Sequence, residues 1–245
     1  MAKYKLVVLD MDGTVLDENQ QIPERNRQAI LDAAAAGVTV MFATGRSIQS
    51  AQPYVEQLEM KSPIITVNGG EVWRQLNDLW YRKTLQAEVV RRLRELALEH
   101  GTWYWAYAVE GLYNRDRWIE DPDTATWLKF GFFCEDMTVL ETIRRELITW
   151  ERLEISNSHP KNIEINPKGI TKAAGLMRIC EWMGLDMSQV VAMGDSLNDI
   201  PMIRAAGLGV AMGNAQEAVK EAADLVTLTN TEYGVADVIY RYVLS

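Results

Sequence analysis

Two hydrophobic patterns alternate along both ends of the chain. Continuous apolar runs predict strands that are buried on both faces, and these runs occupy Tyr4–Leu9, Val38–Ala43, Ile64–Val67, Val190–Met193, Leu208–Met212 and Leu225–Leu228. Apolar residues at helical spacing lie between them, at Pro23–Ala36, Ile170–Met183, Asp199–Ala206, Ala215–Ala223 and Thr231–Val243. Strands that alternate with helices predict an α/β fold, a Rossmann-like doubly wound parallel sheet.

The middle of the chain follows a different pattern. Amphipathic helices are predicted at Thr84–His100 and Asp136–Ile148, each followed by a pair of strands. The residues expected on the buried helix faces are Val89, Leu93, Leu96 and Ala97, and then Val139, Ile143 and Leu147. The predicted strands are Thr102–Val109 with a partner after the turn at Gly111, and Leu153–Ser158 with Asn162–Ile165. We therefore expect an α+β domain with an antiparallel sheet, inserted at 82–166 into a core formed by 1–81 and 167–245.

Composition and charge narrow the possible functions. The 245 residues are 48% hydrophobic and 24% charged, as in ordinary globular proteins. A net charge of −9 repels polyanions, so we expect no nucleic-acid partner. No apolar run approaches the ~20 residues of a membrane helix, and Leu6–Leu9 is too short for a signal peptide. The expected protein is soluble, cytoplasmic and without a membrane partner, and Cys134 and Cys180 are expected to be free thiols.

Polar residues follow three of the predicted strands. The first strand runs into Asp10–Thr14 (DMDGT), the second into Thr44–Ser47 (TGRS), and the strand at 190–193 into Gly194–Asp199 (GDSLND). Ligands of open α/β sheets bind outside the carboxyl ends of the strands. Several carboxylates buried there need a cation to offset their charge, and Mg²⁺ prefers oxygen ligands. Each segment alone fits a turn or a helix cap, but their convergence at one sheet edge predicts a site.

A lysine begins the helix that precedes the third of these strands. Lys172 gains nothing from the helix dipole at that end, so a nearby anion would account for it. The neighbouring Lys168 is expected at the surface.

Together these segments resemble the haloacid dehalogenase (HAD) superfamily of phosphohydrolases, and most closely the Cof-like phosphatases with an inserted type C2 cap. Four motifs occur in the order of the family: DMDGT at Asp10–Thr14, ATGR at Ala43–Arg46, NPKGITK at Asn166–Lys172 and GDSLND at Gly194–Asp199. VNGG at Val67–Gly70 is similar to a further loop of the family. The resemblance covers both halves of the core and is weak in the cap.

The resemblance implies a Mg²⁺-dependent phosphatase of small phosphomonoesters, such as sugar phosphates, that works through an aspartyl-phosphate. It makes Asp10 the nucleophile, Asp12 the general acid and base, and Lys172 the cation beside the phosphoryl group. It implies that Mg²⁺ is held by Asp10, Asp12 through its backbone carbonyl, and Asp195, with Asp199 behind them as a partner of Lys172 or of a metal-bound water. The residues implied to bind the phosphoryl group are Met11, Asp12, Thr44, Gly45, Lys172 and Asn198.

Two other functions remain open. A phosphomutase would share the aspartyl-phosphate but return the phosphoryl group to its substrate. A regulator would bind a phosphorylated metabolite without turnover, although a binding protein needs no acid at Asp12. In every case the expected partner is a small phosphorylated metabolite. These motifs do not identify the substrate, the cap residues that contact it, or the oligomeric state.

Overall fold

A computed structural model describes residues 3–245 and divides into two compact units. One unit combines the chain up to Tyr81 with Thr171–Ser245, and the other is Arg82–Ile170. The second unit extends past the expected boundary at 166 because its strand β10 (Asn162–Pro167) continues to Pro167. Within residues 3–245, we find no helix with the length and apolar content needed to span a membrane.

The first unit is built on a mainly parallel sheet. Its described strands have the order β13-β12-β11-β1-β2-β3-β4-β5. The bounds are β1 (Leu6–Leu9), β2 (Thr39–Ala43), β3 (Ile64–Thr66), β4 (Glu71–Gln75), β5 (Asp78–Arg82), β11 (Val190–Gly194), β12 (Leu208–Ala211) and β13 (Leu225–Val226). Strands β13 to β3 run parallel, and β4 is antiparallel to β3. The parallel sheet is confirmed, whereas β4 and β5 were absent from the predicted set.

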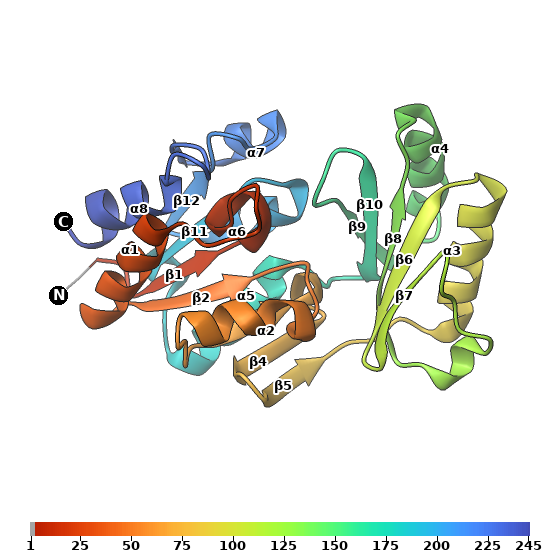
Figure 1. Ribbon diagram of the computed structural model, residues 1–245, viewed down its shortest axis with the longest axis horizontal. Coiled ribbons are helices and arrows are strands. Elements are labelled where there is room, and N and C mark those ends of the chain that lie inside the picture. The colour runs from red at the N-terminus through yellow and green to blue at the C-terminus, as the bar shows by residue number, and fades with distance from the viewer. Residues whose placement is uncertain (1–2) are drawn as a thin grey trace. The chain divides into compact units, whose positions relative to one another are not determined.

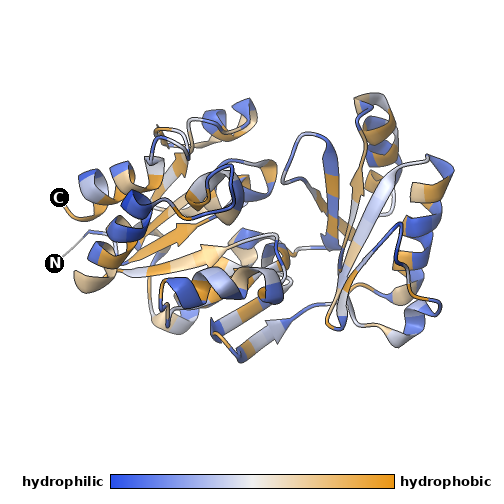
Figure 2. Ribbon diagram, viewed as in Figure 1, coloured by the Kyte–Doolittle hydropathy of each residue, from blue (hydrophilic) through white to orange (hydrophobic). Residues whose placement is uncertain are grey.

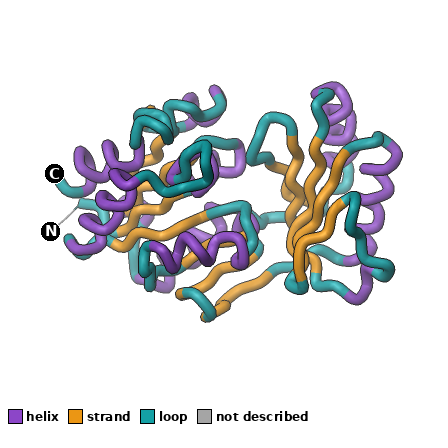
Figure 3. Tube along the Cα trace, viewed as in Figure 1, coloured by secondary structure: helices purple, strands orange, loops and turns teal. Residues whose placement is uncertain are grey.

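Helices cover both faces of this sheet, as expected for a doubly wound fold. Their bounds are α1 (Glu24–Ala35), α2 (Ile48–Gln57), α5 (Lys172–Met183), α6 (Ile200–Ala205), α7 (Glu217–Ala222) and α8 (Gly234–Val238). Alternate residues of β1 point to opposite faces. Val7 and Leu9 join a core cluster with α1, α2 and α8, whereas Leu6 and Val8 join a cluster with α5 and α6. Figure 2 shows the central strands as the hydrophobic interior of the unit, and Figure 3 shows the helices packed around them.

The second unit is an antiparallel sheet with two helices on one face. Its described strands have the order β7-β6-β8-β10-β9, and α3 and α4 lie on the same side of them (Figure 1). The bounds are α3 (Ala87–Glu99), β6 (Trp103–Ala108), β7 (Gly111–Asn114), β8 (Trp127–Phe133), α4 (Met137–Ile148), β9 (Leu153–Ser156) and β10 (Asn162–Pro167). The predicted α+β insert is confirmed. The two predicted strand pairs are incomplete, because the unpredicted β8 lies between β6 and β10 and pairs with both.

The helix faces of the second unit differ from the prediction by one residue in each helix. Val90 and Leu140 are fully buried, whereas the predicted Val89 and Val139 are only half-buried. Helix α3 also begins at Ala87 instead of Thr84, because the Leu85 N–H donates to the Trp127 carbonyl at 2.8 Å. That bond places Leu85 against the end of β8 and outside the helix.

Candidate active site

The candidate residues converge where three neighbouring strands end. Strands β11, β1 and β2 are adjacent in the sheet, and their carboxyl ends carry the acid and threonine segments. After β1 the chain makes an irregular helical turn at Met11–Val15, in which Gly13 has a φ of 76°. A Cβ on Gly13 would lie 2.5 Å from Asp195 Oδ2. Glycine at this position therefore allows the loop after β1 to approach the loop after β11.

A buried lysine links two of the acids. Lys172 Nζ lies 2.5 Å from Asp10 Oδ1 and 2.6 Å from Asp199 Oδ1. Lys172 and Asp199 are completely buried, and Asp10 is 5% exposed. The preceding residue, Thr171, caps α5 by accepting a hydrogen bond from the Ala174 N–H, which fixes the point where Lys172 enters the site.

Asp199 has partners for both of its carboxylate oxygens. Besides Oδ1, which faces Lys172, its Oδ2 accepts hydrogen bonds from the backbone N–H groups of Asp195 and Ser196, each at 3.0 Å. These bonds cap the short helical turn at Leu197–Asp199. Asp199 therefore organises the loop after β11 and orients Lys172, and both of its carboxylate oxygens are engaged in these contacts.

Asp195 presents the opposite situation. Its Oδ2 accepts a 3.1 Å hydrogen bond from the Ser196 hydroxyl, but its Oδ1 is buried and has no hydrogen-bond partner among the described residues. Asp10, Asp195 and Asp199 each offer an oxygen within 4.8 Å of the others. Three carboxylates against one ammonium leave an excess negative charge, which a divalent cation would offset. The donor set and the orphaned oxygen therefore fit a hard divalent metal ion.

The charged groups of the cluster shift one another's pKa values. Burial raises the pKa of Asp10 well above its ordinary value, Lys172 lowers it, and Asp199 and Asp195 raise it. Burial and the charge of Asp199 raise the pKa of Asp195 to about 7. Burial lowers the pKa of Lys172, but the carboxylates of Asp10 and Asp199 raise it more, so that it lies above its ordinary value. Lys172 thus remains an ammonium, while Asp10 and Asp195 compete for protons in the metal-free protein.

Asp12 lies beside the buried acids in a more open position. Its side chain is 44% exposed, and both of its oxygens accept hydrogen bonds from Arg46, from Nε at 2.8 Å and from Nη2 at 2.6 Å. The hydrogen bonds to Asp12 raise the pKa of Arg46, which therefore stays charged. We predicted no role for Arg46, although it is the charged residue of the ATGR motif and lies in the loop that follows β2.

The remaining predicted phosphate ligands lie on the same loops. Thr44 is buried at the end of β2, and its Oγ1 accepts the Arg46 N–H at 3.1 Å. The Asn198 side chain donates to Asn68 Oδ1 at 3.1 Å, and its own Oδ1 is buried and unpartnered among the described residues. Met11 and Gly45 are each the second residue after the end of β1 and β2, respectively. Asn68, in the VNGG loop, is a second residue to which the sequence analysis gave no role.

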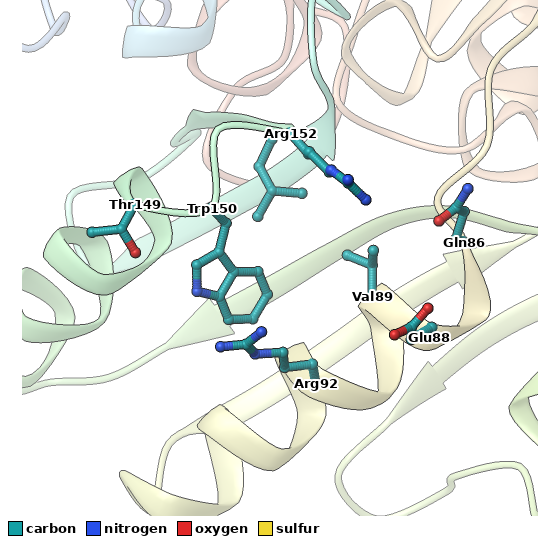
Figure 4. Close-up of a pocket in the computed structure, with 8 residues that line it drawn as sticks. Gln86, Glu88, Val89, Arg92, Thr149, Trp150 and Arg152 are labelled. Atoms are coloured by element: carbon teal, nitrogen blue, oxygen red, sulfur yellow. The ribbon is translucent and has the colours of Figure 1, made fainter.

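A cavity of about 340 Å³ occurs within the second unit and involves none of these residues. Its lining comes from α3 and from the connection between α4 and β9, and Arg92 stacks on the Trp150 ring at 4.5 Å from the ring centroid. Figure 4 shows the two arginines of the lining, Arg92 and Arg152, and the Trp150 ring, which projects from the connection toward Arg92 on the helix. The cavity contributes nothing to the acid cluster, whose residues all belong to the first unit.

Comparison with known proteins agrees with this geometry. The family model described as haloacid dehalogenase-like hydrolase matches residues 7–120 and 114–239. The Bacillus subtilis 5-amino-6-(5-phospho-D-ribitylamino)uracil phosphatase YcsE is 45% identical over 98% of this chain and 96% of its own length. The phosphatase YitU of the same organism, named for the same substrate, is 30% identical and covers 98% of each chain.

A solved structure shows the same fold. The haloacid dehalogenase-like hydrolase from Bacteroides thetaiotaomicron is 32% identical, covers 98% of this chain and 99% of its own, and has a TM-score of 0.81. The match extends over the inserted unit as well as the sheet that carries the acid cluster. With the family model and the near full-length relatives, it establishes that this chain belongs to the haloacid dehalogenase-like hydrolases.

Proposed function

We propose that the protein is a Mg²⁺-dependent phosphatase that hydrolyses a small phosphomonoester through a phosphorylated Asp10. The observation that carries the proposal is the buried group of Asp10, Lys172 and Asp199 at one sheet edge, joined by the partly buried Asp195, whose Oδ1 has no hydrogen-bond partner among the described residues. A structural ion pair needs one acid for one lysine. Three clustered acids with one lysine, two of them buried, are costly to the apoprotein, and such arrangements are typical of sites that bind a cation or an anionic substrate.

The proposed reaction assigns a separate task to each carboxylate. An Asp10 oxygen forms a bond to phosphorus as the bond from phosphorus to the leaving alkoxide breaks. Asp12 gives its proton to that alkoxide and then takes a proton from the water that cleaves the aspartyl-phosphate. Water oxygen ends on the released phosphate, and Asp10 and Asp12 return to their starting states. The exposure of Asp12 favours this role, since it must reach solvent and substrate in turn.

The phosphoryl group needs cations and hydrogen-bond donors around it. Lys172 supplies one charge, and the Thr44 hydroxyl, the backbone N–H groups of Met11, Asp12 and Gly45, and the Asn198 amide supply donors in our proposal. Asp10, Asp195 and the Asp12 carbonyl would hold the Mg²⁺, with Asp199 behind them. When bound, Mg²⁺ supplies the further positive charge that offsets the phosphoryl oxygens.

The relatives suggest the first substrate to test. Two of them, at 45% and 30% identity, are named for 5-amino-6-(5-phospho-D-ribitylamino)uracil, a phosphate ester of a sugar alcohol joined to a pyrimidine. We propose this compound, ahead of simple sugar phosphates, as the substrate. A location in the cytoplasm remains a prediction from the sequence.

Phosphate release from a panel of phosphomonoesters, with Mg²⁺ or with EDTA, tests the proposal. We expect Mg²⁺-dependent release, highest for the ribitylaminouracil phosphate, and a loss of at least about 1000-fold in Asp10→Asn. Activity of Asp10→Asn near that of the wild type would disprove the nucleophile. Isomerised substrate without free phosphate would indicate a phosphomutase. Tight binding of the compound without any turnover by the Mg²⁺-loaded wild type would indicate a regulator.

A further inference from the structure

The side chains of Asp12 and Arg46 form a two-point ion pair between two loops of the first unit. Asp12 belongs to the loop after β1 and Arg46 to the loop after β2, 34 residues apart in sequence. Arg46 Nε and Nη2 bind separate oxygens of the same carboxylate, at 2.8 and 2.6 Å. This fork geometry fixes the plane of the carboxylate as well as its position.

Arg46 is itself held on its other sides. Its Nη2 also donates to Gln20 Oε1, and its guanidinium carbon lies 5.2 Å from the centroid of the Tyr54 ring. The Tyr54 hydroxyl in turn donates to the Gln20 carbonyl at 3.0 Å. Gln20 is in a tight turn where Asp17 Oδ1 accepts the Asn19 and Gln21 N–H groups. The guanidinium therefore has a fixed position, unlike the arginine of an isolated surface pair.

The pair has a consequence for the proposed reaction, on whose correctness the following inference rests. Both Asp12 oxygens are occupied by Arg46, yet proton transfer to the leaving group requires one of them to face the substrate. We propose that Arg46 is a positioning residue: it holds the Asp12 carboxylate at the edge of the site and releases one oxygen when the leaving group of the substrate takes its place. The released oxygen takes up a proton from solvent and passes it to the departing alkoxide, while the second oxygen remains on the guanidinium, so that Asp12 turns about a fixed point.

A comparison of leaving groups tests this role. Alkoxides need a proton as they depart, whereas p-nitrophenolate departs readily without one. We expect Arg46→Ala to lower kcat/KM at least about tenfold for an alkyl phosphate that the wild type hydrolyses, and less than about threefold for p-nitrophenyl phosphate. The ratio kcat/KM covers only the steps up to departure of the leaving group, so the later task of Asp12 as a base does not affect it.

Three further variants complete the experiment. Arg46→Lys retains the charge but loses the two-point contact, and should show the same selective loss in smaller measure. Gln20→Ala should lower kcat/KM for the alkyl phosphate by a smaller factor, because it removes only one of the contacts that hold the guanidinium. Arg27→Ala removes the half-buried arginine that pairs with Glu24 on α1, and should leave the hydrolysis of both substrates unaffected. Added guanidinium chloride, at concentrations that leave the wild type unaffected, should restore part of the alkyl phosphatase activity of Arg46→Ala.

The outcomes separate this inference from the proposed function. Equal losses on both substrates would mean that Arg46 binds the phosphoryl group, and unchanged activity would make the pair a surface contact; either result overturns the inference and leaves the phosphatase proposal intact. A wild type that releases no phosphate from either substrate overturns the proposed function and this inference with it. Thermal unfolding of each variant identifies losses that arise from misfolding.

Discussion

At the level of single residues, Lys172 determines the character of the site. Its ammonium group is the only cation that contacts Asp10 and Asp199 among the described side chains, and all three groups are almost completely buried. The pair of contacts is costly to form but far more costly to break, because a buried carboxylate without its cation retains the whole desolvation penalty. The charge balance of the site therefore depends on this one side chain.

Replacement of Lys172 by methionine should affect both activity and stability. At pH 8 in EDTA we expect the free energy of unfolding to fall by about 3–5 kcal/mol, and phosphatase activity to disappear. Without Lys172 the already raised pKa of Asp10 rises further, so the folded variant binds more protons than the unfolded chain. The deficit in stability should therefore shrink as the pH falls from 8 to 5. Urea unfolding measures it, and Lys168→Met, at an exposed lysine of the same motif, is the matched control.

Asp195 makes the opposite contribution to the stability of the metal-free protein. Its folded-state pKa of about 7 lies above the ordinary value of 3.8, so the ionised carboxylate destabilises the fold above pH 7. In EDTA, Asp195→Asn should then raise the free energy of unfolding by about 1–3 kcal/mol and the thermal midpoint by a few degrees. It should also abolish the further rise in the midpoint that Mg²⁺ gives the wild type.

The pH dependence provides a second check on Asp195. In EDTA the wild type should gain stability as the pH falls from 8 to 5, because its folded state takes up a proton that the unfolded state does not bind. Asp195→Asn should gain less over the same range. A variant that is less stable than the wild type in EDTA at pH 8 would show that Asp195 stabilises the apoprotein, contrary to this argument.

At the level of elements, strand ends explain why much of the site could be predicted. Strands β1 and β11 are short apolar runs that stop at an acid, and parallel strands necessarily bring such ends to one edge. The sequence therefore indicated that Asp10 and Asp195 would meet, and the resemblance to the motifs of the family added Lys172 to them. Their individual roles remain proposals. The sequence analysis gave Arg46 no role because its partner, Asp12, follows a different strand. The spacing of the ATGR motif does not indicate which acid Arg46 contacts.

Strand β8 shows the limit of the hydrophobic pattern. Its residues are buried on both faces, so WLKFGFF lacks the alternation that identifies a half-exposed strand. It also contains Lys129, which is buried beside Glu164 of β10 at 2.9 Å. A lysine in an apolar run normally indicates a surface position. The partner that makes its burial possible is 35 residues away in sequence, and only the fold identifies it.

The VNGG loop gives a prediction about how elements position Lys172. Gly69 has a φ of 100°, and a Cβ on it would lie 2.3 Å from the carbonyl oxygen of Thr171, the residue before Lys172. Gly69→Ala should therefore displace the start of α5 and lower kcat at least about tenfold. Gly37 has a φ of 82°, and no atom lies within 4 Å of an added Cβ. Gly37→Ala should therefore lower the free energy of unfolding only by the cost of the left-handed backbone, about 1–2 kcal/mol.

Steady-state kinetics and thermal unfolding separate the two glycine variants. Both should lose stability, but only Gly69→Ala should lose turnover. Equal effects on kcat would show that left-handed backbone strain alone, and not the contact with Thr171, governs activity.

At the level of the whole molecule, each unit has its own hydrophobic core. The clusters of the first unit draw on both chain ends, whereas that of the second unit comes entirely from within residues 82–170. The order of strand and helix patterns along the chain was sufficient to predict this division into an α/β and an α+β part. Within residues 3–245, the group of acids that fits a metal ion belongs to the first unit. A bound ion should therefore stabilise the core of that unit directly.

Hydrogen–deuterium exchange with and without Mg²⁺ tests this separation. A ligand at 100 times its dissociation constant stabilises the unit that binds it by about 2.7 kcal/mol, which slows exchange through unfolding of that unit about 100-fold. We expect this slowing in the amides of β1 and β11 and much less in those of β6 and β8, because the two cores share no cluster. Asp195→Asn should eliminate the slowing in β1 and β11. Equal protection of β6 and β8 by Mg²⁺ would mean that the two cores unfold together, and that a metal held by one unit stabilises the entire chain.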